Sequence, residues 1–261
     1  MTTKTTSPDE LRRELARRLG LYGLLARWDE LGDQPWVTML LDCEEVERQR
    51  RSLERRIRDA HIGTFKPMCD YDWDWPTEID RAQIEDLFTF QFIAEGANAI
   101  LVGSNGLGKS MIAQNLAHQA LLRGYTVLYT SASAMLNELA AQDTAAALSR
   151  KLKHYCAPQL LQIDEVGYLE YDNRYADLLF QVVSRRYESR RSIGITTNRV
   201  FAEWNQVFPN SACVVTLIDR LIHRAEISQI VGESYRLKEA KERAAERTAK
   251  RKKSRKEKQE S

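Results

Sequence analysis

The hydrophobic residues of the chain recur at two spacings, and the change between the spacings predicts which segments are helices and which are strands. In residues 1–63 they recur every three to four positions, as at Leu11, Leu15 and Leu19, which is typical of helices. Farther along, short apolar runs bounded by polar or turn residues alternate with helical stretches. The four runs are residues 99–102, 125–129, 160–163 and 192–197. This alternation of buried strands and helices predicts an α/β fold.

Changes in the pattern divide the chain into four segments. Residues 1–63 predict a small N-terminal helical domain made of three helical stretches. Residues 64–79 contain two prolines and four aromatic residues without periodicity, which predicts a linker whose aromatic side chains pack against the core. Residues 80–237 hold the strand and helix patterns of the core. Residues 238–261 are highly charged and contain no aromatic residue, which predicts a disordered tail.

The third N-terminal helix, predicted from about Val37 to Ala60, combines an apolar stripe with a surface rich in arginine. Two interpretations of this surface stay open. The arginines form a solvated face that nearby glutamates balance, or they bind DNA phosphates or a partner protein. The arginines concerned are Arg48, Arg50, Arg51, Arg55, Arg56 and Arg58.

A glycine-rich segment directly after the first apolar run carries the strongest chemical signal. It has the pattern G-x-x-x-x-G-K-S between a predicted strand and a predicted helix, which is typical of a phosphate-binding loop. Glycines allow the backbone N–H groups to face a phosphate that side chains would otherwise block. We expect Lys109 to reach the β- and γ-phosphates of ATP and Ser110 to ligate Mg²⁺. The predicted phosphate-binding residues are Gly103, Ser104, Asn105, Gly106, Leu107, Gly108, Lys109 and Ser110.

Polar residues at the ends of two later strands complete the predicted site. Asp164 follows a buried run and is placed to hold Mg²⁺, while the next residue, Glu165, is placed to polarise a water molecule for attack on the γ-phosphate. Asn198 ends another strand and would hydrogen-bond the γ-phosphate or the attacking water, or else is simply a turn-forming residue. Together with the phosphate-binding loop, the acidic pair favours ATP hydrolysis over mere nucleotide storage.

Composition limits the class of protein. The chain has 261 residues, of which 43% are hydrophobic, enough for a substantial core. No apolar run approaches the roughly 20 residues of a membrane-spanning helix, and the polar N-terminus lacks the apolar region of a signal peptide. The four cysteines are far apart, which predicts neither a disulfide framework nor a zinc site. We therefore expect a cytoplasmic protein without a membrane partner.

Charge is unevenly distributed. The net charge is only +2, but residues 238–261 contain eleven Lys/Arg against five Asp/Glu, so the rest of the chain is acidic. A basic tail on an acidic body predicts contact with a polyanion, and the alternative is a tail that is simply solvated.

The ordered series of motifs resembles the IstB/DnaC-like group of AAA+ ATPases, and within that group the IstB transposition helper proteins of insertion sequences. The resemblance covers most of residues 10–240 and is more specific than the phosphate-binding loop alone. The matching segments are residues 81–84, 103–110, 163–168, 197–198, 201–204, 219–221 and 232–236.

The resemblance implies an AAA+ P-loop NTPase core, in which a parallel sheet with the AAA+ strand order is flanked by helices. It departs from full AAA+ proteins at one point, because residues 237–261 are too polar to form the core of a helical lid domain. The lid is therefore expected to be absent or vestigial. In this group a helical insertion after the second strand lines the DNA path. Here the insertion corresponds to residues 132–155, and its candidate DNA contacts are Arg150, Lys151 and Lys153.

The resemblance also assigns roles to individual residues. Asn198 corresponds to the sensor-1 residue, and Arg220 to an arginine finger that acts on the ATP of a neighbouring subunit, with Arg224 as the second candidate. Arg236 resembles a sensor-2 residue. The predicted catalytic residues are therefore Lys109, Asp164, Glu165, Asn198 and Arg220.

The activity implied is a DNA-stimulated ATPase that regulates transposition. Such a protein would oligomerise head to tail, as a ring or a helix, on duplex DNA with ATP, and would select or remodel the target DNA. It would recruit or stimulate a cognate, IstA-like transposase and disassemble on hydrolysis. The alternative is a DnaC-type replicative helicase loader, whose N-terminal segment grips a helicase and whose preferred polymer is single-stranded DNA. Stimulation of the ATPase by duplex or by single-stranded DNA would separate the two.

Overall fold

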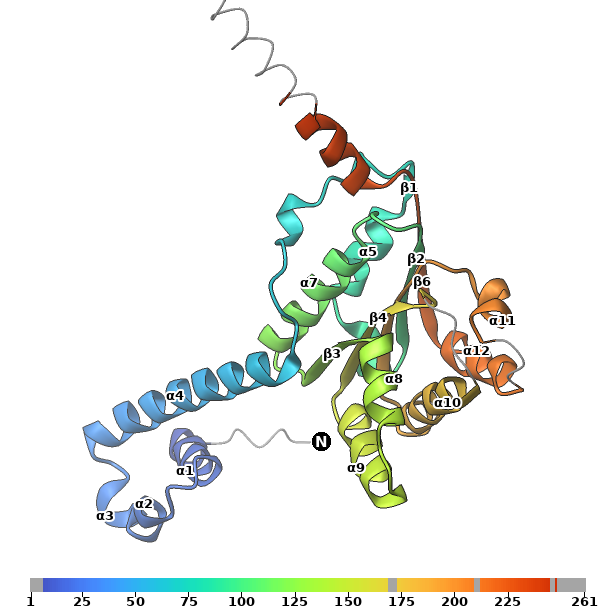
Figure 1. Ribbon diagram of the computed structural model, residues 1–261. Coiled ribbons are helices and arrows are strands. Elements are labelled where there is room, and N and C mark those ends of the chain that lie inside the picture. The colour runs from blue at the N-terminus through green and yellow to red at the C-terminus, as the bar shows by residue number, and fades with distance from the viewer. Residues whose placement is uncertain (1–6, 169–172, 209–211, 245–246, 248–261) are drawn as a thin grey trace, which may run out of the picture. The chain divides into compact units, whose positions relative to one another are not determined.

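The computed structural model describes residues 7–168, 173–208, 212–244 and 247 (Figure 1). It divides into two compact units, Met1–Arg58 and Asp59–Ser261, so the division falls before residue 63, where we expected the N-terminal domain to end. The last residues of the long N-terminal helix thus belong to the second unit, which also contains every strand and the candidate site.

The first unit is helical and has a small core of its own. Its helices are α1 (Pro8–Arg18), α2 (Tyr22–Ala26), α3 (Trp28–Leu31) and α4 (Pro35–Ala60), so the second predicted helical stretch is divided into two. Helix α1 begins at a capping box, in which the Ser7 hydroxyl accepts from the Glu10 N–H and the Glu10 carboxylate accepts from the Ser7 N–H. The core residues of this unit are Ala16, Leu19, Trp28, Val37 and Leu41.

The arginine-rich surface of α4 is partly neutralised by its own glutamates, which pair with Arg48, Arg50 and Arg51. Glu47 accepts hydrogen bonds from Arg50 and Arg51, and these bonds lower the pKa of Glu47 to about 2. Arg50 also pairs with Glu54. Such pairs four or three residues apart are neighbours on one face of a helix. For these arginines the geometry favours the first interpretation, a solvated face with balanced charge.

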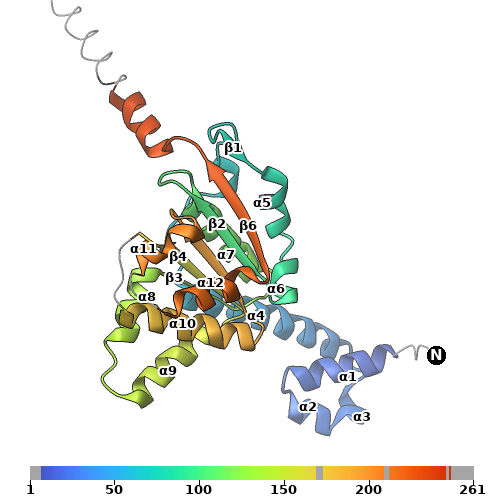
Figure 2. The same ribbon diagram turned by 90° about the vertical axis from the view of Figure 1, so that its right-hand side faces the viewer.

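The second unit is built on a six-stranded sheet whose strand order is β1-β6-β2-β5-β4-β3 (Figure 2). Strands β2, β3, β4, β5 and β6 pair in parallel, and the short β1 is antiparallel to β6. The predicted parallel sheet is confirmed, and it carries the short antiparallel β1 at one edge; neither β1 nor its neighbour β6 was predicted. The strands are β1 (Glu78–Ile79), β2 (Asn98–Gly103), β3 (Val127–Ser131), β4 (Leu160–Val166), β5 (Ser192–Thr197) and β6 (Ala225–Val231).

Helices cover both faces of the sheet, which explains why the central strands are apolar on both sides. Helices α5 and α7 lie on one face, and α10, α11 and α12 lie on the other (Figure 1). The larger core lies between the sheet and the second group, and α8 and α9 also contribute to it. The bounds are α5 (Arg81–Leu87), α6 (Gln91–Glu95), α7 (Lys109–Leu122), α8 (Ala132–Ala140), α9 (Ala145–Cys156), α10 (Asn173–Glu188), α11 (Trp204–Val207) and α12 (Val214–Ile222), with 3₁₀ turns at η1 (Met68–Asp70) and η2 (Phe201–Glu203).

Two predicted helices are each broken into a pair. The stretch before the phosphate-binding loop divides into α5 and α6, because Phe90 adopts a left-handed conformation with φ of 65° and its side chain is buried. The predicted insertion divides into α8 and α9, each of which begins at its own side-chain cap, Ser131 and Thr144 respectively. Both breaks are made by local backbone geometry within segments whose helical periodicity we read as continuous.

The chain continues after β6 as a helix over residues 235–244. The prediction of a disordered tail from residue 238 is therefore wrong as far as residue 244, and residues 245–246 and 248–261 lie outside the described residues. Two long-range ion pairs hold this helix to the linker, Lys238 with Asp72 at 3.2 Å and Glu239 with Lys66 at 3.4 Å.

The helices offer no candidate for a membrane span. Among the described residues, every helix is too short or too polar to cross a bilayer.

Candidate nucleotide-binding site

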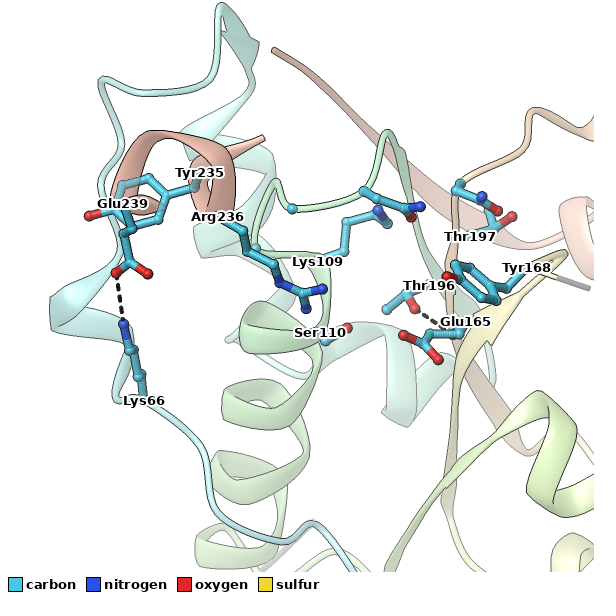
Figure 3. Close-up of a pocket in the computed structure, with 14 residues that line it drawn as sticks. Lys66, Lys109, Ser110, Glu165, Tyr168, Thr196, Thr197, Tyr235, Arg236 and Glu239 are labelled. Atoms are coloured by element: carbon cyan, nitrogen blue, oxygen red, sulfur yellow. Dashed lines mark hydrogen bonds and ion pairs between the residues drawn. The ribbon is translucent and has the colours of Figure 1, made fainter. Parts of the chain in front are cut away.

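A pocket of about 310 Å³ lies where the carboxyl ends of β4 and β5 meet the start of α7 (Figure 3). Ligands of open α/β sheets bind at this edge. The pocket unites the phosphate-binding loop with Glu165 and Asn198, as the sequence predicts, and Arg236 enters it from the helix of residues 235–244. These side chains come from four separate parts of the chain, and the sheet topology brings them together.

The glycines of the loop are required by close neighbours as well as by their conformation. Gly106 and Gly108 have φ of 82° and 83°, a region that other residues rarely adopt. A Cβ atom at Gly106 would lie 2.2 Å from the Ser234 hydroxyl, and one at Gly108 would lie 2.5 Å from the ring of Tyr71. The loop is thus closed in by the linker and by the segment after β6, and larger side chains would force these apart.

Lys109 is buried at the first position of α7 and is only 9% exposed. Its ammonium group donates to the carbonyl oxygens of Gly103 and Ser104, both at 2.7 Å. Burial lowers the pKa of Lys109 to about 8. An anion in the pocket would compensate this desolvated charge far better than two neutral carbonyl groups do, which fits the predicted role in binding the β- and γ-phosphates.

The Asp164 carboxylate accepts hydrogen bonds from three hydroxyl groups. The Ser110 hydroxyl donates to Oδ1 at 3.0 Å, the Thr196 hydroxyl donates to the same oxygen, and the Tyr129 hydroxyl donates to Oδ2 at 2.7 Å. The structure thus brings together the two predicted Mg²⁺ ligands, Ser110 and Asp164. A hydroxyl and a carboxylate beside a phosphate-binding loop are the ligand types that Mg²⁺ takes in nucleotide sites, so the residues fit the ion.

Glu165 occupies an irregularity in β4. Its φ is 61°, which is uncommon for a residue other than glycine, and the register between β4 and β5 shifts between Ile163 and Val166. The Glu165 N–H donates to the Thr196 hydroxyl at 2.9 Å. Without the bulge, successive side chains of β4 would continue to point to alternate faces of the sheet. With it, the exposed Glu165 carboxylate lines the pocket on the side where Ser110 lies (Figure 3).

Asn198 lies directly after β5 and has an unpaired polar atom. Its Oδ1 is buried and has no hydrogen-bond partner within the described part of the chain, although the residue lines the pocket. An unsatisfied buried acceptor costs roughly 1–3 kcal/mol, so such atoms are rare unless a ligand or water pairs with them. This favours the predicted role in binding over a simple turn.

Arg236 reaches into the pocket toward Lys109 and Ser110 (Figure 3). Its positive charge adds to the lowering of the Lys109 pKa that burial mainly causes, so the two cations lie close enough to repel each other. The pocket has further lining residues to which the sequence analysis assigned no role: Lys66, Tyr168, Thr196, Thr197, Tyr235 and Glu239. Of these, Tyr168, Thr197 and Tyr235 lie in the matching segments 163–168, 197–198 and 232–236, and Thr196 lies at the end of a predicted strand.

The linker frames the pocket, and its aromatic residues pack against the core as predicted. The Tyr71 hydroxyl donates to the carbonyl oxygen of Leu107 in the loop at 2.9 Å, and burial raises the pKa of Tyr71 to about 12. The Trp75 indole N–H donates to the Glu233 carbonyl oxygen at 2.7 Å. The linker and the C-terminal helix therefore hold the loop from two sides.

The two candidate finger residues lie outside this pocket. The Arg220 guanidinium on α12 stacks over the rings of Phe180 and Tyr187, 5.2 and 5.7 Å from their centres. Arg224 is exposed just after α12. Neither arginine lines the nucleotide pocket of its own chain.

The three predicted DNA contacts on α9 differ in their surroundings. Arg150 and Lys153 are exposed. Lys151 instead pairs with Glu138 of α8 at 2.6 Å, and the other oxygen of Glu138 accepts from the Tyr155 hydroxyl. Two of the three are therefore available as free surface charges, whereas the charge of Lys151 is already balanced.

Comparison with known proteins places this site in a family. Residues 10–244 match the protein-family model described as IstB-like ATP binding protein. A relative from Geobacillus stearothermophilus, named as the ATP-binding protein of insertion sequence IS5376, is 33% identical over 235 residues, covering 87% of this chain and 93% of its own. Another from Pseudomonas aeruginosa, named for insertion sequence IS21, is 32% identical over 210 residues, covering 80% and 79%.

Solved structures give the same fold. DnaI superposes with a TM-score of 0.51 at 19% identity, over 64% of this chain and 89% of its own. DnaA from Aquifex aeolicus bound to AMPPCP superposes with a TM-score of 0.50 at 19% identity, over 68% of this chain and 56% of its own. At these identities the likeness establishes the architecture alone, which is that of DnaA- and DnaI-like AAA+ domains.

Proposed function

The chain belongs to the IstB-like ATP-binding proteins of insertion sequences, and from that premise we propose that it is a DNA-stimulated ATPase that assists a transposase. The observation that carries the proposal is that Lys109, Ser110 and Glu165 line one pocket, while Asp164 accepts a hydrogen bond from Ser110 beside it. A protein that only stored nucleotide would need the phosphate-binding loop but not the acidic residue that faces it.

The proposed reaction assigns one task to each side chain. Lys109 exchanges its two carbonyl partners for the β- and γ-phosphates. Mg²⁺, held by Ser110 and Asp164, would offset the phosphate charge. Glu165 orients a water molecule and takes its proton as the water oxygen bonds to the γ-phosphorus and the bond from that phosphorus to the ADP oxygen breaks. Asn198 hydrogen-bonds the water or the γ-phosphate.

We propose that a second copy of the chain completes each pocket. Arg220 lies outside the pocket of its own chain, so it can reach an ATP only across a head-to-tail contact. Such heterologous contacts generate closed rings or open helices. ATP bound at the contact favours assembly because it binds the assembled form better than the free subunit, and loss of the γ-phosphate weakens the contact.

The DNA partner in this proposal is a duplex, and the protein partner is the cognate, IstA-like transposase. Arg150 and Lys153 are exposed on α9 and suit contacts to phosphates, which hold DNA with little sequence selectivity. Target DNA would be bound or bent by the ATP-bound assembly and released after hydrolysis. The transposase partner is supported by the relatives, which carry the names of insertion sequences.

The test measures ATP turnover with Mg²⁺ alone, with random duplex DNA and with single-stranded DNA. We expect duplex DNA to stimulate turnover and to bind more tightly with ATP than with ADP as salt is raised. Stronger stimulation by single-stranded DNA would instead support a helicase loader of the DnaC type. Equal duplex affinity in both nucleotide states would contradict the proposed assembly cycle.

A mixing experiment tests the shared pocket. K109A subunits lack a working ATP site but keep Arg220, whereas R220A subunits keep the site but lack the finger. Mixed together, they should recover part of the turnover that neither shows alone. No recovery in mixtures that still assemble would refute completion of the pocket by a neighbour.

A further inference from the structure

The hydrogen bonds around the two acidic residues lead beyond the side chains predicted to touch ATP. Asp164 lies on β4, between a tyrosine of β3 and a threonine of β5. The Tyr129 and Thr196 hydroxyls donate to different oxygens of its carboxylate, Tyr129 to Oδ2 at 2.7 Å and Thr196 to Oδ1. The carboxylate is therefore held from both neighbouring strands, and its Oδ1 is also the oxygen to which Ser110 donates.

The Thr196 hydroxyl makes a second contact that Tyr129 does not. It accepts from the backbone N–H of Glu165 at 2.9 Å while it donates to Asp164. A hydroxyl has one donor hydrogen and two acceptor lone pairs, so one group can do both. Thr196 is 1% exposed, and water does not compete for these bonds. The side chain of Asp164 and the main chain of Glu165 are thereby fixed to the same atom.

This double contact lies where the backbone is strained. A φ of 61° at Glu165 is unfavourable for a residue with a Cβ, and it persists only where the surroundings enforce it. The bulge of β4 puts the Glu165 N–H within reach of Thr196, and the hydrogen bond to the hydroxyl holds it there. Loss of the hydroxyl would leave both the orientation of the Asp164 carboxylate and the direction of the Glu165 side chain less restricted.

We propose that Thr196 and Tyr129 are positioning residues of the ATPase: Thr196 sets the relative placement of Asp164 and Glu165, and Tyr129 fixes which Asp164 oxygen faces Ser110. The inference rests on the ATPase function proposed above. Neither hydroxyl is assigned to ATP or Mg²⁺, and each acts through the acidic residues. Because precise placement of catalytic groups depends on such supporting contacts, losing one hydroxyl should alter the response to Mg²⁺.

The experiment uses the full chain with four substitutions. T196V removes the hydroxyl at nearly constant shape, T196S restores it, and Y129F removes the second hydroxyl. The matched control is Y155F, because the Tyr155 hydroxyl also donates to a carboxylate, that of Glu138, but between α9 and α8. The readouts are turnover without DNA as Mg²⁺ is varied, and the affinity for a fluorescent ATP analogue with Mg²⁺ and with EDTA.

We expect T196V to raise the Mg²⁺ concentration for half-maximal turnover about tenfold and Y129F about threefold, because each variant loses one hydrogen bond to the charged carboxylate and T196V also loses the bond from the Glu165 N–H. T196V should also lower the maximal rate, because Glu165 loses its anchor, and T196S should restore both values. The control Y155F should match the wild type. Affinity for the analogue in EDTA should be the same in all five proteins, since the hydroxyls do not act on the phosphates directly.

The outcomes separate this inference from the proposed function. If the wild type hydrolyses ATP with Mg²⁺ while T196V and Y129F keep the wild-type Mg²⁺ requirement and rate, the positioning role is refuted and the ATPase stands. If the wild type binds ATP without hydrolysing it, the ATPase proposal fails. The Mg²⁺ dependence of analogue binding in the variants then still shows whether the two hydroxyls position Asp164. If T196V shows no thermal unfolding transition, it does not fold, and the Mg²⁺ requirements and rates of Y129F and T196S then decide between these outcomes.

Discussion

The nucleotide pocket and the basic surface of α9 both contain charged residues, but they hold them in opposite ways. In the pocket Lys109 is buried, and beside it Asp164 accepts three hydrogen bonds from three different elements. On α9, Arg150 and Lys153 are exposed to solvent. Interactions of buried groups depend on the position of single atoms, whereas exposed charges act mainly through their number and are screened by salt. Substitutions should therefore have large, specific effects in the pocket and small, additive effects on α9.

The largest expected effect concerns Arg220, which lies outside the pocket of its own chain and is proposed to act in the pocket of a neighbour. R220A should lower DNA-stimulated turnover by about 10³-fold or more, which is the range known for arginine fingers in GTPases. The affinity for ATP should remain, because Arg220 stacks on Phe180 and Tyr187 and does not line the pocket of its own chain. The measurement is turnover at saturating ATP and duplex DNA, beside ATP affinity by equilibrium titration.

Two variants make the R220A result specific. R220K keeps the positive charge but loses the planar guanidinium, and it should remain strongly impaired. R224A should keep most of the turnover. If R220A turns over ATP normally and R224A does not, the finger role belongs to Arg224.

The next effect tests the pocket itself. E165Q keeps the size of the side chain but cannot take a proton, so turnover should fall by about 10²–10⁴-fold while ATP binding persists. The variant should remain on duplex DNA after ATP is added, because the proposed release depends on hydrolysis. Dissociation from DNA at the wild-type rate, measured alongside turnover in the same sample, would separate release from hydrolysis and count against the proposed cycle.

These residues could be found in the sequence because their spacing is tied to local structure. The phosphate-binding loop lies between a strand and a helix that both have clear apolar patterns, and Asp164, Glu165 and Asn198 come at strand ends. Such signals need no knowledge of which strands are neighbours. The roles of Thr196 and Tyr129 do need it, because their hydroxyls meet Asp164 only once β3, β4 and β5 are paired.

The features that the sequence reading missed are likewise set by distant contacts. Strand β6 alternates buried and exposed residues in its second half and lacks an apolar run, since it lies near the edge of the sheet. The helix of residues 235–244 has a highly charged sequence, and ion pairs with Asp72 and Lys66 of the linker hold it. No pattern within either segment indicates which distant residues or strands it contacts.

A moderate effect is expected from pH, and it contrasts the two regions directly. In the free protein burial lowers the pKa of Lys109 to about 8, and bound phosphates would raise it. Below pH 8 Lys109 is already protonated, so ATP affinity should be nearly constant. Above pH 8 binding must take up a proton, and affinity should fall up to tenfold per pH unit. The measurement is ATP affinity in EDTA from pH 7 to pH 9.5.

Substitution and DNA binding provide the controls for the pH effect. K109R should bind ATP less well but with a flatter pH profile, because arginine stays protonated throughout this range. Duplex affinity measured without nucleotide should not decline above pH 8 in the same way, since Lys109 takes no part in the proposed DNA contacts of α9. An ATP profile that is flat for the wild type would mean that Lys109 stays charged when buried.

The smallest effect is expected on α9, where it appears in the salt dependence of DNA binding. Each residue that contacts a phosphate contributes about 0.9 to the slope of log affinity against log salt, so R150A and K153A should each reduce the slope by about 1 and do so equally for unrelated duplexes. K151A should reduce it less, because Lys151 already pairs with Glu138 at 2.6 Å and releases fewer counterions on binding. E138Q would free Lys151 and should steepen the slope. Equal reductions for all three cations would mean that Lys151 leaves Glu138 for the DNA, and a slope unchanged in the R150A/K153A double variant would place the DNA on another surface.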